Sequence, residues 1–245
     1  MLRKISSCVQ LTEPETDFLT ELQTTRMRIE RGKEIAHEGQ ARQDAYILQA
    51  GWACSFKLLP DGGRQIITFP VPGDCIGLRS ILLRTSDHSF SALTDIIVTR
   101  IEIQTLRKMF SDFPYLGTAL LWTISREEAM LVEHLVSIGR RSAIERTAHF
   151  ILELFDRLTL VGLTRGSEFE CPINQYLLGD ALGLSTIHVN RILRQLRTRN
   201  LVTVRNRRVI IHDPAALREL ASYTSVDGDP LLKSLERRQS PMGRD

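Results

Sequence analysis

The spacing of hydrophobic positions changes along the chain, and each change predicts a different kind of element. In the first 110 residues, short runs rich in β-branched and aromatic residues alternate with turn signals. The clearest turn, Asp61-Gly62-Gly63, separates the runs ACSFKLL and RQIITFPV and predicts a hairpin. Many short strands between regular turns are typical of an antiparallel barrel or roll. We therefore predict a β-roll of strands and turns over residues 1–111.

A helical pattern replaces the strand pattern after Pro114. Apolar residues recur at spacings of three and four up to Ile138, which indicates a coiled-coil-like seam of roughly three heptads. A helix that packs only on its own domain would show a similar pattern, and both can hold if opposite faces are used. We predict a dimerisation helix over residues 112–138. Its seam residues are Leu121, Ile124, Glu128, Leu131, Leu135 and Ile138. Glu128 would destabilise this seam unless it is paired or near solvent.

The remaining chain predicts a third unit over residues 139–222. Gly139 is expected to break the long helix, and Ser142 can cap the next one, IERTAHFILELFDRL. A polar loop, TRGSEFECP, then leads to a short helix that ends at Gly183. After a second helix, LVTVRNRRVIIHD predicts a β-hairpin with a basic tip, and DPAALRELA predicts a last helix. Residues 223–245 are rich in Gly, Pro, Ser and charge and are expected to be disordered.

Residues 184–196, LSTIHVNRILRQL, carry the pattern of the second helix of a helix-turn-helix. Gly183 can adopt the positive φ of a tight turn, and Ser185 is a favourable N-cap. Gly179 supplies a small residue where two helices joined by such a turn approach each other. Apolar residues form one stripe, and the opposite face is polar except for Ile187. The stripe consists of Val189, Ile192, Leu193 and Leu196, and the opposite face of Thr186, Ile187, Asn190, Arg191 and Arg194.

The charge of the chain is concentrated around this helix. The net charge is only +3, but seven arginines and no acidic residue lie between Ser185 and Arg208. Such a block is either a solvated basic face or a surface that binds a polyanion. A three-helix packing unit with a solvated face remains the simpler alternative. The block and the basic hairpin that follows favour DNA, since arginine can pair bidentately with guanine and a helix start can hold a phosphate.

Other function classes receive little support from the sequence. Cys8, Cys54, Cys75 and Cys171 are far apart and form no metal-ligand spacing. The chain contains no phosphate-binding loop and none of the common hydrolase or metalloprotease motifs, so we do not expect an enzyme. It shows neither a signal peptide nor an apolar run long enough for a membrane span. We expect a cytoplasmic protein with no metal or cofactor, whose thiols can still be redox-active.

The order of β-roll, long helix and winged helix-turn-helix resembles the Crp/Fnr transcription regulators. The resemblance covers residues 10–222, and its most specific stretches are ERGKEIAHEGQ, AYILQAGWACSFKLLPDGGRQIITFPVPGDCIG and ALGLSTIHVNRILRQLRTRNLV. It implies an α+β fold: an N-terminal antiparallel β-roll like a cyclic-nucleotide-binding jelly roll, a dimerisation helix and a C-terminal winged helix-turn-helix. It also implies a homodimer that binds a near-palindromic DNA site through the recognition helix 185–197.

The resemblance assigns roles within that helix and also shows a departure. Arg191 matches the family residue that reads a guanine. Ile187 stands where the family usually has a Glu, so it could instead pack on a thymine methyl. His188 lies where the family often has a Thr near phosphate. Our base-reading candidates are Thr186, Ile187, Asn190 and Arg191. Our phosphate candidates are Ser185, His188, Arg194, Arg197, Arg205, Arg207 and Arg208.

The stretch that would bind a cyclic nucleotide also departs from the family. In GDCIGLRSILLRTSDHSFSAL, Leu78 replaces the ribose-binding Glu, and His88 stands where the phosphate-binding Arg belongs. We therefore disfavour a cyclic nucleotide. The oxygen-sensing members of the family use an N-terminal cluster of cysteines, and Cys8 stands alone, so we also disfavour an iron–sulfur cluster. Effector-pocket candidates are Gly77, Leu78, Arg79, His88 and Ser89, for an unidentified signal.

The sequence thus predicts a DNA-binding transcription regulator. Its expected partners are double-stranded DNA, a second copy of itself, and RNA polymerase if it is an activator. The alternative is a ligand-binding or protein-interaction module whose winged helix no longer binds DNA.

Overall fold

The computed structural model describes residues 2–6, 9–41, 44–83 and 85–225 of the 245-residue chain. The helices are α1 (Leu2–Ser6), α2 (Glu13–Leu22), α3 (Leu78–Leu83), α4 (Ile103–Asp112), α5 (Pro114–Arg140), α6 (Ala143–Leu160), α7 (Gln175–Leu182), α8 (Thr186–Thr198) and α9 (Pro214–Ala221). The strands are β1 (Met27–Ile29), β2 (Glu34–Ala36), β3 (Asp44–Ala50), β4 (Ala53–Leu58), β5 (Arg64–Thr68), β6 (Cys75–Ile76), β7 (Ser89–Ala92), β8 (Ile96–Glu102), β9 (Thr164–Arg165), β10 (Glu168–Glu170), β11 (Val202–Arg205) and β12 (Arg208–Ile211).

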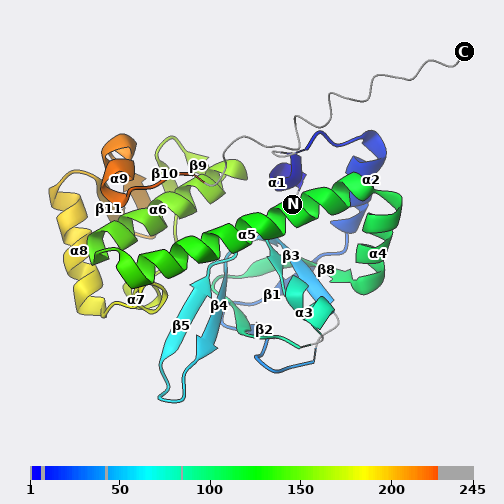
Figure 1. The fold of residues 1–245 in the computed structure, drawn as a ribbon, viewed down its shortest axis with the longest axis horizontal. Helices are drawn as coiled ribbons and strands as arrows, with labels where there is room; N and C mark the ends of the chain where they lie inside the picture. The colour runs from blue at the N-terminus through cyan, green and yellow to red at the C-terminus, as the bar shows by residue number, and fades with distance from the viewer. Residues whose placement is uncertain (1, 7–8, 42–43, 84, 226–245) are drawn as a thin grey trace, which may run out of the picture.

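Two antiparallel sheets form the predicted β-roll (Figure 1). One has the strand order β1-β8-β3-β6 and the other β2-β7-β4-β5. Buried residues from both sheets, such as Leu48, Val98 and Phe90, pack into a shared core. The predicted hairpin is also present, because β4 pairs with β5 across the turn at Asp61. The predicted α+β class and the antiparallel roll are confirmed.

The prediction of strands and turns alone in this part is wrong, because α1 to α4 also lie there. These helices are short, and each buries only a few residues. In α2, the backbone N–H of Thr12 donates to the carboxylate of Glu15 at 2.8 Å, which forms half of a capping box. In α4, Leu106 and Met109 are buried one helical turn apart. Periods this short are easily lost between strand-like runs.

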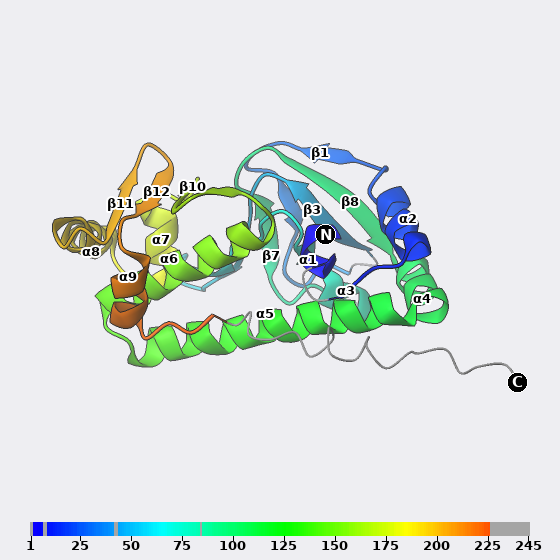
Figure 2. The same ribbon diagram turned by 90° about the horizontal axis from the view of Figure 1, so that it is seen from above.

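Helix α5 runs along both the roll and the C-terminal unit (Figure 2). The prediction that Gly139 breaks it is wrong, since α5 continues through Gly139 to Arg140. The chain turns at Arg141, whose ψ of 145° is extended. Ser142 then caps α6, and its N–H donates to the Glu145 carboxylate at 2.8 Å. Glycine is tolerated in a helix at a modest energetic penalty, so this capping box locates the break better than Gly139 does.

The C-terminal unit packs α6 to α9 against a small antiparallel sheet. The strand order is β11-β12-β10-β9, so the predicted polar loop TRGSEFECP forms a hairpin instead. Phe169 explains the difference, because it is 3% exposed and pairs opposite Val209 of β12. The predicted basic hairpin is confirmed: Asn206 and Arg207 turn the chain with φ values of 52° and 60°.

The roll and the C-terminal unit share one hydrophobic cluster. Phe56 and Phe69 of the roll belong to the same cluster as Phe150 and Leu154 of α6. The rings of Phe69 and Phe150 lie 5.8 Å apart in an edge-to-face arrangement. In this structure the C-terminal unit is therefore docked on the roll. Most of the tail predicted to be disordered, residues 226–245, lies outside the described residues.

Candidate nucleic-acid interface

Helices α7 and α8 form a helix-turn-helix whose turn depends on two glycines. Asn174 caps α7, since its side-chain oxygen accepts the N–H of Leu177 at 2.9 Å. Gly183 ends α7 in the left-handed region with φ of 64°. A Cβ at Gly179 would lie 2.5 Å from the carbonyl oxygen of Leu184. The predicted close approach of the two helices at Gly179 is therefore confirmed.

The second helix is oriented by its cap and its apolar stripe. The N–H of His188 donates to the hydroxyl of Ser185 at 3.3 Å. Val189, Ile192 and Leu196 are buried and Leu193 is half-buried against the same core. This packing turns the predicted DNA-contacting face outward. Thr186 and His188 on that side are half-buried, and Ile187, Asn190, Arg191 and Arg194 are exposed.

Ile187 is the most exposed large apolar side chain of this face, at 84%. Single exposed apolar residues occur on many protein surfaces. At the first turn of a helix-turn-helix second helix, however, the side chain is placed where base edges are contacted. Ile187 and Arg191 lie four residues apart, and thus one above the other on the same helix face. Together they can present one apolar and one bidentate hydrogen-bonding group to a major groove.

The arginines predicted to contact phosphate lie on two elements, helix α8 and the β11–β12 hairpin. Asn190, Arg194 and Arg197 of α8 line a hollow of about 140 Å³ with Val204 of β11. Arg205 and Arg207 are exposed at the tip of the β11–β12 hairpin. Figure 2 shows α8 and this hairpin at the end of the molecule that lies away from α2 and α4. The predicted phosphate candidates of the helix and of the hairpin thus lie on neighbouring elements at one end of the molecule.

Arg208 differs from the other arginines of the hairpin. Its Nη1 lies 3.5 Å from the carboxylate of Glu168 on β10, so part of its charge is already neutralised. Glu168 was not among the predicted residues, because its stretch was expected to be a loop and forms β10 instead. The pairing predicts that Arg208 contributes less to phosphate binding than Arg205 and Arg207 do.

Helix α5 presents an uncovered apolar stripe along the predicted seam. Leu121, Leu131, Leu135 and Ile138 are exposed, with Leu135 at 73%. Glu128 is exposed too, so a second helix packed on this stripe would have to leave it near solvent or pair it. Ile124 is half-buried against the core of the roll. Exposed apolar residues at heptad spacing on a long helix are typical of a helix–helix interface.

Four of the five effector-pocket candidates line one cavity of about 170 Å³ between the roll and α5. These are Gly77, Leu78, Arg79 and His88. Ser89 is not among the lining residues, and its hydroxyl instead accepts the N–H of Glu38 at 3.0 Å. The cavity is also lined by residues that sequence reasoning missed. They include Asp87, which precedes β7, His134 of α5 and Arg157 of α6.

Arg79 and His88, the two basic candidates of this cavity, already have a partner. Arg79 Nη2 and His88 Nδ1 each lie 2.7 Å from the carboxylate of Asp87. Burial on its own would raise the pKa of Asp87, but the neighbouring His88 and Arg79 lower it below its usual value. Burial also lowers the pKa of His88 and so favours its neutral form. An anionic ligand would compete here with an existing carboxylate.

Of the described cysteines, Cys54 and Cys171 are buried, and Cys75 is half-buried and lines the same cavity. Burial raises the pKa of the Cys54 and Cys75 thiols to about 12 and that of Cys171 to about 11. Reactive cysteines need the thiolate form, which these shifts disfavour. Cys8 lies outside the described residues. Within the described ranges, no three His, Cys, Asp or Glu side chains form a metal-binding group, and no helix is long and apolar enough to cross a bilayer.

Comparison with known proteins identifies both of the predicted domains. Residues 26–113 match the cyclic nucleotide-binding domain, and residues 145–220 match the Crp-like helix-turn-helix domain. The chain is 32% identical over 192 residues to the nitrogen fixation regulation protein FixK of Rhizobium meliloti, over 78% of this chain and 84% of the relative. It is 25% identical over 220 residues to the transcriptional activator protein Anr of Pseudomonas protegens, over 90% and 89% of the two chains.

A solved structure shows the same architecture. The structure of FixK2 from Bradyrhizobium japonicum is similar with a TM-score of 0.73 at 28% identity. The match covers 82% of this chain and 98% of that one, so it includes the roll, the long helix and the helix-turn-helix. The chain belongs to the Crp/Fnr family of sequence-specific DNA-binding transcription regulators.

Proposed function

We propose that this regulator binds a near-palindromic DNA site as a homodimer, with α8 of each subunit in a major groove. The observation that carries the proposal is the outward face of α8, where Arg191 and Ile187 are both exposed above a buried stripe. The uncovered apolar stripe of α5 supports a second copy as the partner. Two-fold symmetry then implies half-sites about one helical turn apart.

Within each half-site, different residues have different tasks. Arg191 pairs with a guanine, and Ile187 packs on a thymine methyl. Thr186 and Asn190 flank them on the same face. The phosphate contacts come from the cap Ser185, from His188, and from the arginines of helix and hairpin. Phosphate contacts position the protein on the duplex, and base contacts give it sequence specificity.

Control by a signal at the roll is the second part of the proposal. We expect a ligand other than a cyclic nucleotide, or none, because Leu78 offers no acceptor and Asp87 already pairs with Arg79 and His88. As a regulator without a catalytic role, the protein acts in the cytoplasm where the chromosome lies. If it activates transcription, RNA polymerase is a further partner.

Selection of binding sites from random duplex DNA, followed by titration of the selected site at several salt concentrations, tests the proposal. We expect a two-fold-related consensus and an affinity that falls steeply with salt, because phosphate contacts release counterions. Binding that is absent or insensitive to salt would contradict it. That result would favour the alternative, a ligand-binding or protein-interaction module whose winged helix no longer binds DNA.

A further inference from the structure

The side chain of Arg157 crosses from the DNA-binding unit into the β-roll. It starts on α6, and its Nη2 donates to the Asp74 carboxylate at 2.7 Å and to the Phe69 carbonyl oxygen at 2.9 Å. Its Nη1 donates to Glu153 on its own helix at 3.4 Å. The side chains of Arg157, Asp74 and Glu153 are all at least 92% buried. A buried guanidinium thus joins the two units through Arg157 and Asp74, which lie 83 residues apart in sequence.

The rest of this contact is mainly apolar. Phe69, Phe150 and their neighbours hold the two units together, but apolar burial has no directional preference. A guanidinium has a fixed, planar arrangement of donors, so its acceptors must lie at defined positions. A rotation or slide of α6 on the roll would break the contacts of Arg157 with Asp74 and with the Phe69 carbonyl oxygen. These buried groups would then have fewer hydrogen-bond partners, which is unfavourable. The charged contact can therefore select one orientation among several that bury similar apolar area.

When Arg157 is replaced, its acidic partners Asp74 and Glu153 keep other hydrogen-bond partners. Asp74 still accepts Lys4 Nζ at 2.8 Å and the N–H of Val71 at 2.8 Å. Glu153 still pairs with His134 at 2.5 Å. Neither carboxylate becomes an isolated buried charge, so we expect the unit to fold when Arg157 is replaced by glutamine.

We propose that Arg157 is a positioning residue for DNA recognition, which fixes the orientation of the helix-turn-helix relative to the roll and α5. It contacts no DNA itself, because it is buried between the two units. It also lines the cavity that contains Gly77 and His88, so an occupant of that cavity would touch the residue that sets the orientation.

This inference rests on the proposed homodimeric binding mode. Two half-sites are bound together only if the second recognition helix is presented at the correct distance and angle once the first is bound. Once the first half-site is bound, the second recognition helix is present at a high effective concentration near the second half-site. This effective concentration falls when the orientation of the DNA-binding unit is no longer fixed. Loss of the Arg157 contact should therefore weaken binding to a full site while leaving the intrinsic affinity for one half-site unchanged.

The test compares two duplexes of equal length. One carries the selected two-fold site, and the other has one arm replaced by unrelated sequence. We expect Arg157→Gln to lower the ratio of full-site to half-site affinity by roughly 3- to 30-fold, the range found when couplings between sites are perturbed. A general loss of stability would lower both affinities together. Thermal unfolding of each variant verifies that it is folded.

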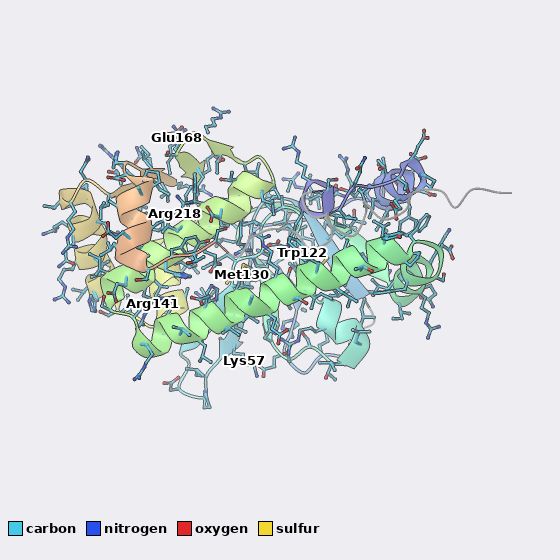
Figure 3. The ribbon with its side chains drawn as sticks, turned by 45° about the horizontal axis from the view of Figure 1, so that its top comes forward. Lys57, Trp122, Met130, Arg141, Glu168 and Arg218 are labelled. Carbon is cyan, nitrogen blue, oxygen red and sulfur yellow. The ribbon has the colours of Figure 1, made fainter. Side chains whose placement is uncertain are left out.

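Asp74→Asn provides a second variant from the opposite side of the contact. It should lower the same ratio, and the double variant should lower it no further than either single change, as in a double-mutant cycle of contacting residues. Arg218→Gln is the matched control. Arg218 on α9 (Figure 3) lies 3.2 Å from Asp156 of α6, so this variant breaks an ion pair of the same helix within the DNA-binding unit.

Three results would overturn the inference. The first is an unchanged ratio in folded Arg157→Gln protein. The second is additive effects of the Asp74 and Arg157 variants. The third is equal affinity of the unmodified protein for both duplexes, which would overturn the dimeric binding mode itself. The first two leave that mode intact, so failure of the inference and failure of the proposed function can be distinguished.

Discussion

The imidazole Nε2 of His134 on α5 lies 2.5 Å from the carboxylate of Glu153 on α6, and the reverse pair lies beside it. His149 of α6 is 3.3 Å from the carboxylate of Glu133 on α5. Figure 3 shows Arg141, which also contacts Glu133, near the end of α5 where the chain turns into α6. Each helix thus contributes one histidine and one glutamate, so we expect the connection between α5 and α6 to be sensitive to pH.

The two histidines should have opposite effects on stability. Burial alone would lower the pKa of His134, but Glu153 outweighs it, so the pKa of His134 is raised above its usual value. Its contribution to stability is therefore fully present below the unfolded pKa of about 6.5 and is lost as the pH rises through the folded pKa. Burial lowers the pKa of His149, so this residue opposes folding as the pH falls below about 6.5.

Unfolding in urea between about pH 5.5 and 8.5, the range in which histidine titrates, checks this prediction. His134→Gln should destabilise the protein most at the acidic end, and the difference should shrink as the pH rises. For His149→Gln the trend reverses, and the variant should gain relative stability toward acidic pH. Parallel pH profiles for the unmodified protein and His134→Gln would show that the contact has no such role.

Arg191→Ala should reduce base discrimination. Loss of one bidentate arginine–guanine pair is expected to cost about 1–3 kcal/mol at that position of the site. The measurement is the affinity ratio between the selected site and random DNA. Arg199→Ala is the control, because Arg199 ends the same helix and lies away from its N-terminal turns. If Arg191→Ala keeps the ratio of the unmodified protein, another residue reads the base.

The hairpin arginines should contribute to the salt dependence of binding. Replacing Arg205 or Arg207 by alanine removes one phosphate contact and should reduce the slope of log affinity against log salt by about 0.9 each. Arg208→Ala should reduce it less, because Arg208 already pairs with Glu168. Arg28→Ala is the control, since Arg28 pairs with Asp95 at 2.7 Å on the roll. Equal slopes for all four variants would place the hairpin away from the DNA.

The predictions that proved correct rest on local patterns in the sequence. Ser185 as a cap, the stripe through Val189 and Ile192, and the turn at Gly183 are all set by residues within a few positions of one another. The same signals identify the helix-turn-helix without knowledge of the rest of the chain. The orientation of the predicted DNA-contacting face follows from them, since a helix that buries one stripe must expose the other.

Features that depend on distant residues could not be predicted. Arg157 and Asp74 meet across 83 positions, and nothing in either neighbourhood indicates the other. Asp87 is next to His88, yet its contact with Arg79 requires the fold around α3. Glu168 was placed in a loop because strand pairs as short as β9–β10 have too few residues for a clear period.

Leu135→Glu should dissociate the proposed dimer. Leu135 is the most exposed apolar residue of the α5 stripe, and a carboxylate buried there against a second helix would be unpaired. Sedimentation over a range of concentrations should show a shift from dimer to monomer, together with loss of full-site DNA binding. Leu82→Glu is the control, because Leu82 on α3 is similarly exposed at 68% but lies outside the stripe. A stable dimer of Leu135→Glu would mean that the subunits associate elsewhere.

Two glycine-to-alanine changes should shift stability in opposite directions. Gly139 lies within α5, and a Cβ there would meet no atom within 4 Å, so Gly139→Ala should stabilise the helix by about 0.5–1 kcal/mol. At Gly179 the added Cβ would lie 2.5 Å from the Leu184 carbonyl oxygen. The two helices of the helix-turn-helix would then have to move apart, at an expected penalty of roughly 1–3 kcal/mol. Urea unfolding of both variants measures the two effects, and DNA titration should show weaker binding for Gly179→Ala alone. A destabilised Gly139→Ala would indicate instead that this end of α5 must unwind in the folded protein.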